Sequence, residues 1–155
     1  MNISILCVGK IKERYLAEGC GEYAKRLSPW VSLRVMEVKE EAEGKNTSLA
    51  AEKESREILK IFKKTDAFRI LLAIRGERLT SERFAAKMEQ WITGGNSHFL
   101  FVIGGSNGVT EEVEAAADLR LSFSDFTFPH QLMRLILLEQ LYRCFSILNN
   151  GKYHK

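Results

Sequence analysis

The sequence predicts a single-domain α/β protein with a mostly parallel sheet and helices on both faces. Five short apolar segments that suit strands alternate with five segments that suit helices, as in sheets whose parallel strands are joined by crossover helices. No internal repeat, low-complexity tract or linker composition divides residues 1–155. A chain of 155 residues has the length of one domain with a sizeable core.

The expected strands are short and rich in apolar or β-branched side chains. Residues 2–8 and 99–103 are nearly continuous apolar runs, typical of strands that a parallel sheet buries on both faces. Residues 31–38 are rich in β-branched side chains, which favour a strand. In chain order, we expect strands at residues 2–8, 31–38, 68–74, 99–103 and 119–123.

The expected helices follow from apolar side chains at helical spacing and from capping residues. Thr47 or Ser48 caps the second helix, whose inner face begins with Leu49, and Thr80 caps the third. Thr110 and the two glutamates behind it begin the fourth, because a hydroxyl cap and early acidic side chains suit the positive end of a helix. We expect helices at residues 12–27, 47–62 and 80–92, from residue 110, and at residues 130–148.

The last expected helix, residues 130–148, is apolar around most of its circumference, which is more than one buried face requires. Either it lies in the centre of one protomer, or one face packs on the sheet and another on a second subunit. We favour a homodimer, because so small a chain leaves little protein to cover a second apolar face. A charge at Leu138 or Leu141 is then expected to give a monomer or an aggregate.

The composition says more about the expected cell compartment than about the binding partner. A net charge of +3 permits an anionic partner without requiring one. Cys7, Cys20 and Cys144 are scattered and lack CxxC spacing, which indicates free thiols in the cytoplasm. The chain shows no secretion-signal pattern, and no apolar run reaches the ~20 residues of a membrane-spanning helix. We therefore expect a cytoplasmic protein without a membrane partner.

Two loops that follow expected strands are candidate ligand sites, because ligands of open α/β sheets bind at the carboxyl ends of strands. The first, Gly104-Gly105-Ser106-Asn107-Gly108, matches neither a dinucleotide fingerprint nor a P-loop, so the residues alone favour a structural turn. The second is rich in hydroxyl and aromatic side chains and leads to His130, with Arg134 one helical turn further. No histidine stands at metal-ligand spacing from a cysteine, an acid or another histidine, so we expect no metal.

Four segments taken together resemble one family of enzymes. They are Phe101-Val102-Ile103-Gly104-Gly105-Ser106-Asn107-Gly108, Thr127-Phe128-Pro129-His130-Gln131-Leu132-Met133-Arg134, Leu138-Glu139-Gln140-Leu141-Tyr142-Arg143 and Tyr153-His154-Lys155. With the chain length and the Val8-Gly9-Lys10 segment, they make the whole chain similar to the bacterial 23S rRNA pseudouridine N3-methyltransferases of the SPOUT superfamily.

The resemblance implies an α/β fold with a C-terminal trefoil knot, and a homodimer that binds S-adenosylmethionine among the loops of the knot. The cofactor loops that it implies are Leu72-Ala73, Gly104-Gly105 and Ser124-Asp125-Phe126-Thr127-Phe128-Pro129. Some relatives carry an acidic residue at the position of Ala73, so no polar contact to the cofactor is implied there.

The implied reaction needs residues that position the substrate and accept a proton. Methyl transfer from a sulfonium requires no metal, but it needs an aligned nucleophile and the exclusion of water. A base assists loss of the proton on N3 of pseudouridine, and His130 and His154 are both candidates. Residues that we expect to position or contact the RNA are Arg134, Arg143, Lys152, Tyr153 and Lys155.

The implied partner is 23S rRNA of the large ribosomal subunit, either free or within the assembled ribosome. Two alternatives remain open, namely a non-catalytic ribosome-associated RNA-binding module and a nucleotide-binding regulator that uses the Gly104 loop. The tail, residues 149–155, is either a solvated terminus or, as the resemblance implies, reaches the cofactor site of the partner subunit.

Overall fold

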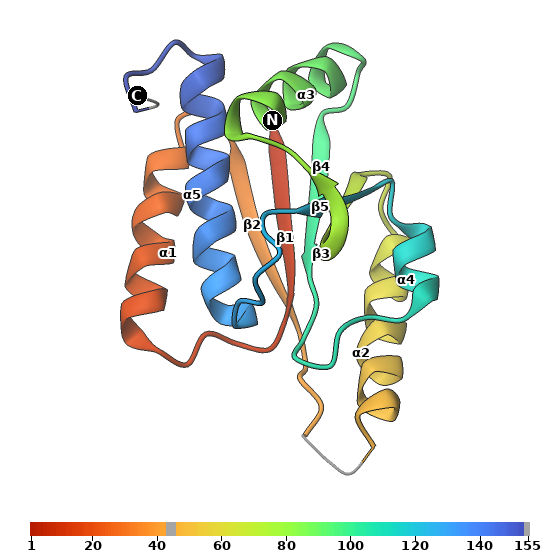
Figure 1. Cartoon of the computed structure of the whole chain (residues 1–155). Coiled ribbons are helices and arrows are strands. Elements are labelled where there is room, and N and C mark those ends of the chain that lie inside the picture. Colours follow the sequence, from red (N-terminus) through yellow and green to blue (C-terminus); the bar gives the residue numbers. More distant parts are fainter. Residues whose placement is uncertain (43–45, 154–155) are drawn as a thin grey trace.

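The computed structural model describes residues 1–42 and 46–153 and confirms the predicted parallel sheet (Figure 1). Its strands lie in the order β2-β1-β4-β3-β5, and each pairs with its neighbours in parallel. The strands are β1 (Asn2–Val8), β2 (Ser32–Val38), β3 (Phe68–Arg78), β4 (His98–Ile103) and β5 (Leu119–Ser122).

Helices cover both faces of the sheet, as expected, because side chains alternate along its central strands. Ile5 and Phe101 face the helices α1, α3 and α5, whereas Leu6 and Val102 face α2 and α4. The two faces therefore carry two separate cores (Figure 1). The helices are α1 (Arg14–Leu27), α2 (Thr47–Phe62), α3 (Ser81–Thr93), α4 (Glu111–Ala116) and α5 (His130–Leu148).

Strand β3 is four residues longer than the sequence predicts. It pairs with β4 and β5 through its first half, and after an irregularity Glu77 and Arg78 pair with the end of β5. Gly76 lies in this irregularity, where a Cβ would stand 2.7 Å from the backbone of Leu121. Only a glycine fits there, so residues 75–78, which follow the predicted end of the strand, are part of an irregular strand pair.

The helix caps agree with the sequence in part. Thr80 accepts a hydrogen bond from the N–H of Arg83 at 3.2 Å, which confirms the predicted cap of α3. Asn46 caps α2 instead of Thr47 or Ser48, because its Oδ1 accepts the N–H of Leu49 at 3.1 Å. Leu49 is 46 % exposed, so its predicted place on the inner face of α2 is wrong.

The segment between β5 and α5 carries the chain from the edge of the sheet to its middle. At the beginning of α5, Gln131 accepts a hydrogen bond from the N–H of Lys12 at 2.8 Å, just beyond β1. Residues 123–129 therefore cross the carboxyl ends of β3 and β4, which lie between β5 and β1 in the sheet. The trefoil knot that the resemblance implies stays a prediction.

Helix α5 buries its central leucines inside one protomer. Leu138 and Leu141 are 1 % and 0 % exposed and belong to the core shared with α1 and α3. Of the two expected results of a charge at these positions, the burial argues for an aggregate and against a folded monomer, since such a charge would disrupt the protomer itself. Among the residues that the structure describes, no helix is long and apolar enough to cross a membrane. The three cysteines are free and buried.

Candidate functional site

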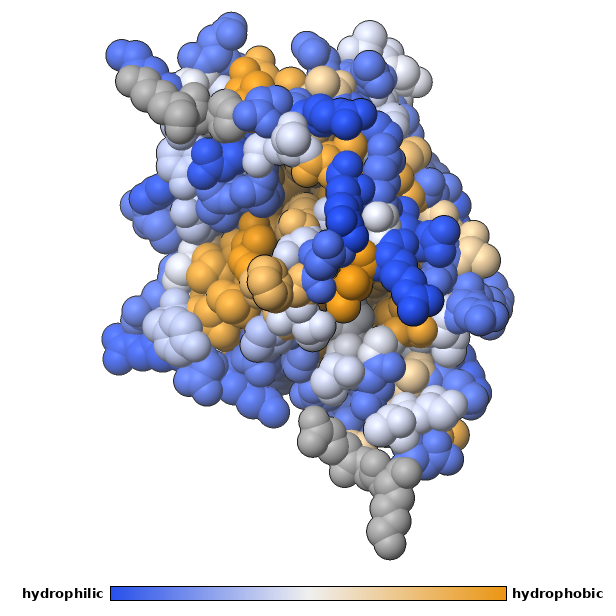
Figure 2. All heavy atoms as spheres, in the orientation of Figure 1, coloured by the Kyte–Doolittle hydropathy of each residue, from blue (hydrophilic) through white to orange (hydrophobic). Residues whose placement is uncertain are grey.

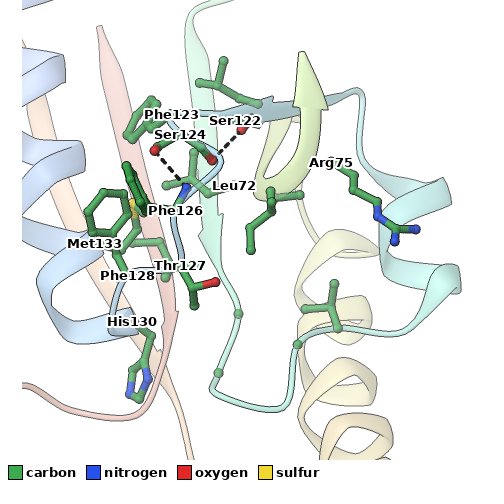
Figure 3. A pocket seen from close by; sticks show the side chains of 18 of the residues that line it. Leu72, Arg75, Ser122, Phe123, Ser124, Phe126, Thr127, Phe128, His130 and Met133 are labelled. Carbon is green, nitrogen blue, oxygen red and sulfur yellow. Dashed lines mark hydrogen bonds between the residues drawn. The ribbon is translucent and has the colours of Figure 1, made fainter. Parts of the chain in front are cut away.

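A cavity of about 680 Å³ lies at the carboxyl ends of β3, β4 and β5 (Figure 3). Its walls come mainly from three segments far apart in the sequence, residues 72–75, 103–109 and 121–130. The structure thus brings together the loops that the resemblance implies for the cofactor, because parallel strands end at the same edge of the sheet. The expected residues that line it are Leu72, Ala73, Gly104, Gly105, Ser124, Phe126, Thr127, Phe128 and Pro129.

Asp125 is the one expected cofactor residue that does not line the cavity. Its carboxylate pairs with the guanidinium of Arg78 at the end of β3, and both side chains are largely exposed. Asp125 lies in a turn that directs its side chain away from the cavity. Ser124 Oγ accepts the N–H of Phe126 at 3.0 Å, and Ser122 Oγ donates to the carbonyl of Ser124 at 3.2 Å (Figure 3).

The glycine turn after β4 forms one wall and packs tightly against the protein behind it. Gly108 has a φ of +75°, and its N–H donates to the carbonyl of Gly105 at 3.0 Å. A Cβ on Gly105 would stand 2.8 Å from Glu54 Oε2 and 2.9 Å from Val8 Cγ1. The turn is therefore both a structural element and a place where bare backbone faces the cavity.

Aromatic and apolar side chains form the opposite wall. Figure 3 shows Phe126, Phe128 and Met133 close together on the side of the cavity nearest α5. Phe126 is 78 % exposed, so this wall continues onto the surface. Arg75 lines the cavity with its strand end, but its side chain extends toward α4 (Figure 3).

Of the expected catalytic residues that the structure describes, only His130 lines this cavity. Its Nε2 lies 3.5 Å from Glu40 Oε1 and makes no hydrogen bond to the described residues. The imidazole can therefore hold a proton between the cavity and a carboxylate.

Arg134, expected to contact the substrate, is instead buried and does not line the cavity. Its side chain is 7 % exposed and donates hydrogen bonds to Glu37 Oε1 at 2.8 Å and to the carbonyl of Gly9 at 3.0 Å. These bonds tie α5 to the ends of β2 and β1. The burial contradicts a direct substrate contact. Burial raises the pKa of the Cys7 thiol to about 11, although the nearby Arg134 acts to lower it.

The other expected catalytic residues that the structure describes lie at the far end of α5. Arg143 donates to Glu139 at 2.5 Å and stands over the ring of Tyr153, 4.8 Å from its centroid. The hydroxyl of Tyr153 contacts that of Tyr23 and also Glu139 Oε1, both at 3.2 Å. The Tyr23 hydrogen bond and burial raise the pKa of Tyr153 to about 12. Lys152 is exposed nearby, while His154 and Lys155 lie outside the described residues.

Tyr153 of one protomer does not lie at the cavity of the same protomer. His130 begins α5 at the cavity, and Tyr153 packs against Tyr142, with ring centroids 4.6 Å apart. Tyr142 stands twelve residues after His130, about 18 Å further along the helix. The candidate residues therefore form two separate groups joined by α5.

The whole chain matches one known protein family. The family described as predicted SPOUT methyltransferase matches residues 1–154. The chain belongs to the SPOUT methyltransferases.

Relatives within this family match the chain over its full length. Proteins named ribosomal RNA large subunit methyltransferase H from Fusobacterium nucleatum and Acetivibrio thermocellus are 50% and 48% identical to it, over all of this chain and all of theirs. One from Bifidobacterium animalis is 50% identical with the same coverage. A solved structure of a probable methylase family protein from Haemophilus influenzae is similar in fold, with a TM-score of 0.55 at 15% identity, over 99% of this chain and 70% of that one.

Sequence reasoning missed several residues of this SPOUT site. Met133 lines the cavity, and its place one helical turn after Pro129 is a signal that helical spacing offers. Glu139 stands four residues before Arg143, the spacing of a helical ion pair, and could have been found in the same way. Tyr23 comes from α1, 130 residues away from Tyr153, and no local pattern indicates that contact. No group of metal-ligating side chains occurs in the part of the chain that the structure describes.

Proposed function

We propose that this chain uses S-adenosylmethionine to methylate N3 of a pseudouridine in the 23S rRNA of the large ribosomal subunit. The observation that carries the proposal is the cavity built from three strand-end loops in a chain that is about half identical, end to end, to proteins named ribosomal RNA large subunit methyltransferase H. The alternative of a non-catalytic RNA-binding module is not favoured, because the family is one of methyltransferases.

The cavity suits a cofactor with an adenine ring and a charged sulfur. Its volume lies within the range of about 300–1,000 Å³ that small-molecule sites occupy. Leu72, Phe126 and Phe128 offer apolar surface for the adenine, and the glycine turn offers backbone N–H and carbonyl groups without side chains in the way. When bound, the cofactor supplies a methyl group on a positively charged sulfur.

The residues of the chain align the substrate and remove its proton. Apolar side chains along the cavity exclude water from the reacting atoms. His130 accepts the N3 proton, and Glu40, 3.5 Å from Nε2, stabilises the imidazolium that results. His154 remains the other candidate for this role. Arg143 and Tyr153 position the nucleotide, with Lys152 and Lys155 contacting phosphate.

The tail acts on the cavity of a second subunit. Tyr153 packs against Tyr142, about 18 Å along α5 from His130 at the cavity of its own protomer, which is too far for contact with a nucleotide bound there. Apolar side chains gather on the surface beside the beginning of α5 (Figure 2), where Phe126 is exposed and Leu132 and Ile136 are half-buried. A second copy that covers this surface supplies the missing tail, so we infer a homodimer with composite sites.

Deleting residues 152–155 tests the proposal. The truncated protein should lose methyl transfer to ribosomes that lack the modification, remain a dimer in light scattering, and bind S-adenosylmethionine within tenfold of the full chain, about 1.4 kcal/mol. The single variant Tyr153→Phe is the matched control and should lose less, since it removes only the hydroxyl that bonds Tyr23 and Glu139. Wild-type turnover by the truncated protein would show that the tail is only a terminus.

A further inference from the structure

Glu54 of α2 is a buried carboxylic acid that lacks a full set of partners. It is 1 % exposed, and its Oε1 accepts the N–H of Glu41 at 3.0 Å. Its Oε2 is buried as well and has no hydrogen-bond partner among the described residues. Burial raises the pKa of Glu54, and the nearby carboxylates of Glu40 and Glu41 raise it further.

The free oxygen of Glu54 faces the cofactor cavity from behind its glycine wall. It lies 2.8 Å from the position that a Cβ on Gly105 would take, and Gly105 itself lines the cavity. The backbone of one glycine therefore separates this oxygen from the space inside. His130, which lines the same cavity, acts in the opposite direction and lowers the pKa of Glu54.

Support of the local structure does not require a carboxyl at this position. A glutamine would accept the same hydrogen bond from Glu41 without the cost of an ionisable group in the interior. The next residue of α2 supports the same loop without a charge. Ser55 Oγ accepts the N–H of Thr110 at 2.9 Å, just after the glycine turn. An acid with an unsatisfied oxygen beside a ligand cavity indicates a functional use of its charge.

We propose that Glu54 acts across Gly105 as the anionic partner of the positively charged sulfur of S-adenosylmethionine. The inference rests on the proposed function, because it takes that cofactor as the ligand. The product S-adenosylhomocysteine has a neutral sulfur, so a negative charge on Glu54 favours the cofactor over the product. The positive sulfur of the cofactor in turn favours the ionised form of Glu54 against the effect of burial. With an effective dielectric constant of about 20, a separation of about 12 Å corresponds to a preference of roughly tenfold in affinity, and a shorter separation gives more. The charge thus helps the spent product leave and fresh cofactor enter.

Calorimetric titration of the full chain with each ligand separately tests the proposal. Glu54→Gln keeps the shape and the Glu41 hydrogen bond, and should weaken S-adenosylmethionine about tenfold and S-adenosylhomocysteine less than about twofold. Ser55→Ala is the matched neutral control and should weaken both ligands equally, because it loosens the same turn without removing charge. Glu52→Gln removes an exposed charge from the same helix and should change neither affinity.

Each outcome decides between the alternatives. An equal loss for both ligands in Glu54→Gln, or no loss, overturns the charge role and leaves Glu54 as a support of the turn. If Glu54→Gln does not fold, Glu54→Asp and Glu54→Asn make the same comparison, because they have the same shape and differ in charge. If both variants show the same ratio of affinity for S-adenosylmethionine to affinity for S-adenosylhomocysteine, the proposal is overturned. A wild-type chain that binds neither ligand refutes the proposed cofactor, a failure distinct from that of Glu54.

Discussion

Replacing Arg134 with alanine is expected to destabilise the protomer by about 3 kcal/mol. The guanidinium joins α5 to Glu37 of β2 and to the carbonyl of Gly9, and its side chain is 7 % exposed. Alanine leaves the buried Gly9 carbonyl without this donor and Glu37 without its counter-charge. Removal of one partner from a buried pair costs about 3–5 kcal/mol, and the lower end applies because Glu37 is one-third exposed and regains water.

Urea unfolding followed by tryptophan fluorescence measures the loss, and the midpoint of thermal unfolding should fall by about 6–12 °C for a chain of this length. Arg83→Ala, at an exposed arginine of α3, is the control and should change stability by less than about 0.5 kcal/mol. If Arg134→Ala keeps the stability of the wild type and loses only rRNA methylation, the structural role is wrong and the substrate contact implied by the resemblance is right.

Two further pairs of variants test the packing around the site. Gly105→Ala should cost about 1–3 kcal/mol by crowding Glu54, whereas Gly21→Ala, with open space around its Cβ on α1, should gain about 0.5–1 kcal/mol in urea unfolding. A neutral Gly105→Ala would contradict the tight packing of the turn. Ile136→Glu should convert the proposed dimer into folded monomers in light scattering, whereas Leu138→Glu should lose about 3 kcal/mol or more of protomer stability. A folded dimer of Ile136→Glu would place the interface elsewhere.

The sequence predicts the elements of this fold where local signals decide them. Helix α5 has the predicted bounds, because a long apolar run follows directly after Pro129. The end of β3 was missed because its last residues are strand only through their pairing with β5, and Gly76 is needed only because the backbone of Leu121 passes so close. Pairing between distant segments leaves no periodic signal in either of them.

The candidate site shows the same division between local and distant causes. The three cavity loops could be grouped from the sequence, since parallel strands end at one edge. The burial of Arg134 could not, because its partners Glu37 and Gly9 stand 97 and 125 residues away. Glu54 was missed for the same reason, since its neighbours Glu41 and Gly105 come from two other segments of the fold.

The two ends of α5 determine how a dimer can divide the reaction between its subunits. Arg134 fixes the beginning of the helix to the sheet, and Glu139 and Arg143 hold Tyr153 against its second half, so the cavity and Tyr153 keep a set distance within each protomer. A two-fold axis then brings both tails to the opposite cavities, or neither.

Mixed dimers measure this arrangement. In a dimer of the chain that lacks residues 152–155 with a Thr127→Trp chain, whose larger side chain fills the cavity from an exposed position, one site has an intact cavity and an intact tail, and the other has neither. Random exchange makes about half of all dimers mixed, and each has one working site of two, so the mixture should recover about a quarter of wild-type methyl transfer. If each tail instead served its own cavity, every site in the mixture would lack one part. Activity would then stay at zero even when heterodimers are shown to form, and the composite site would be refuted.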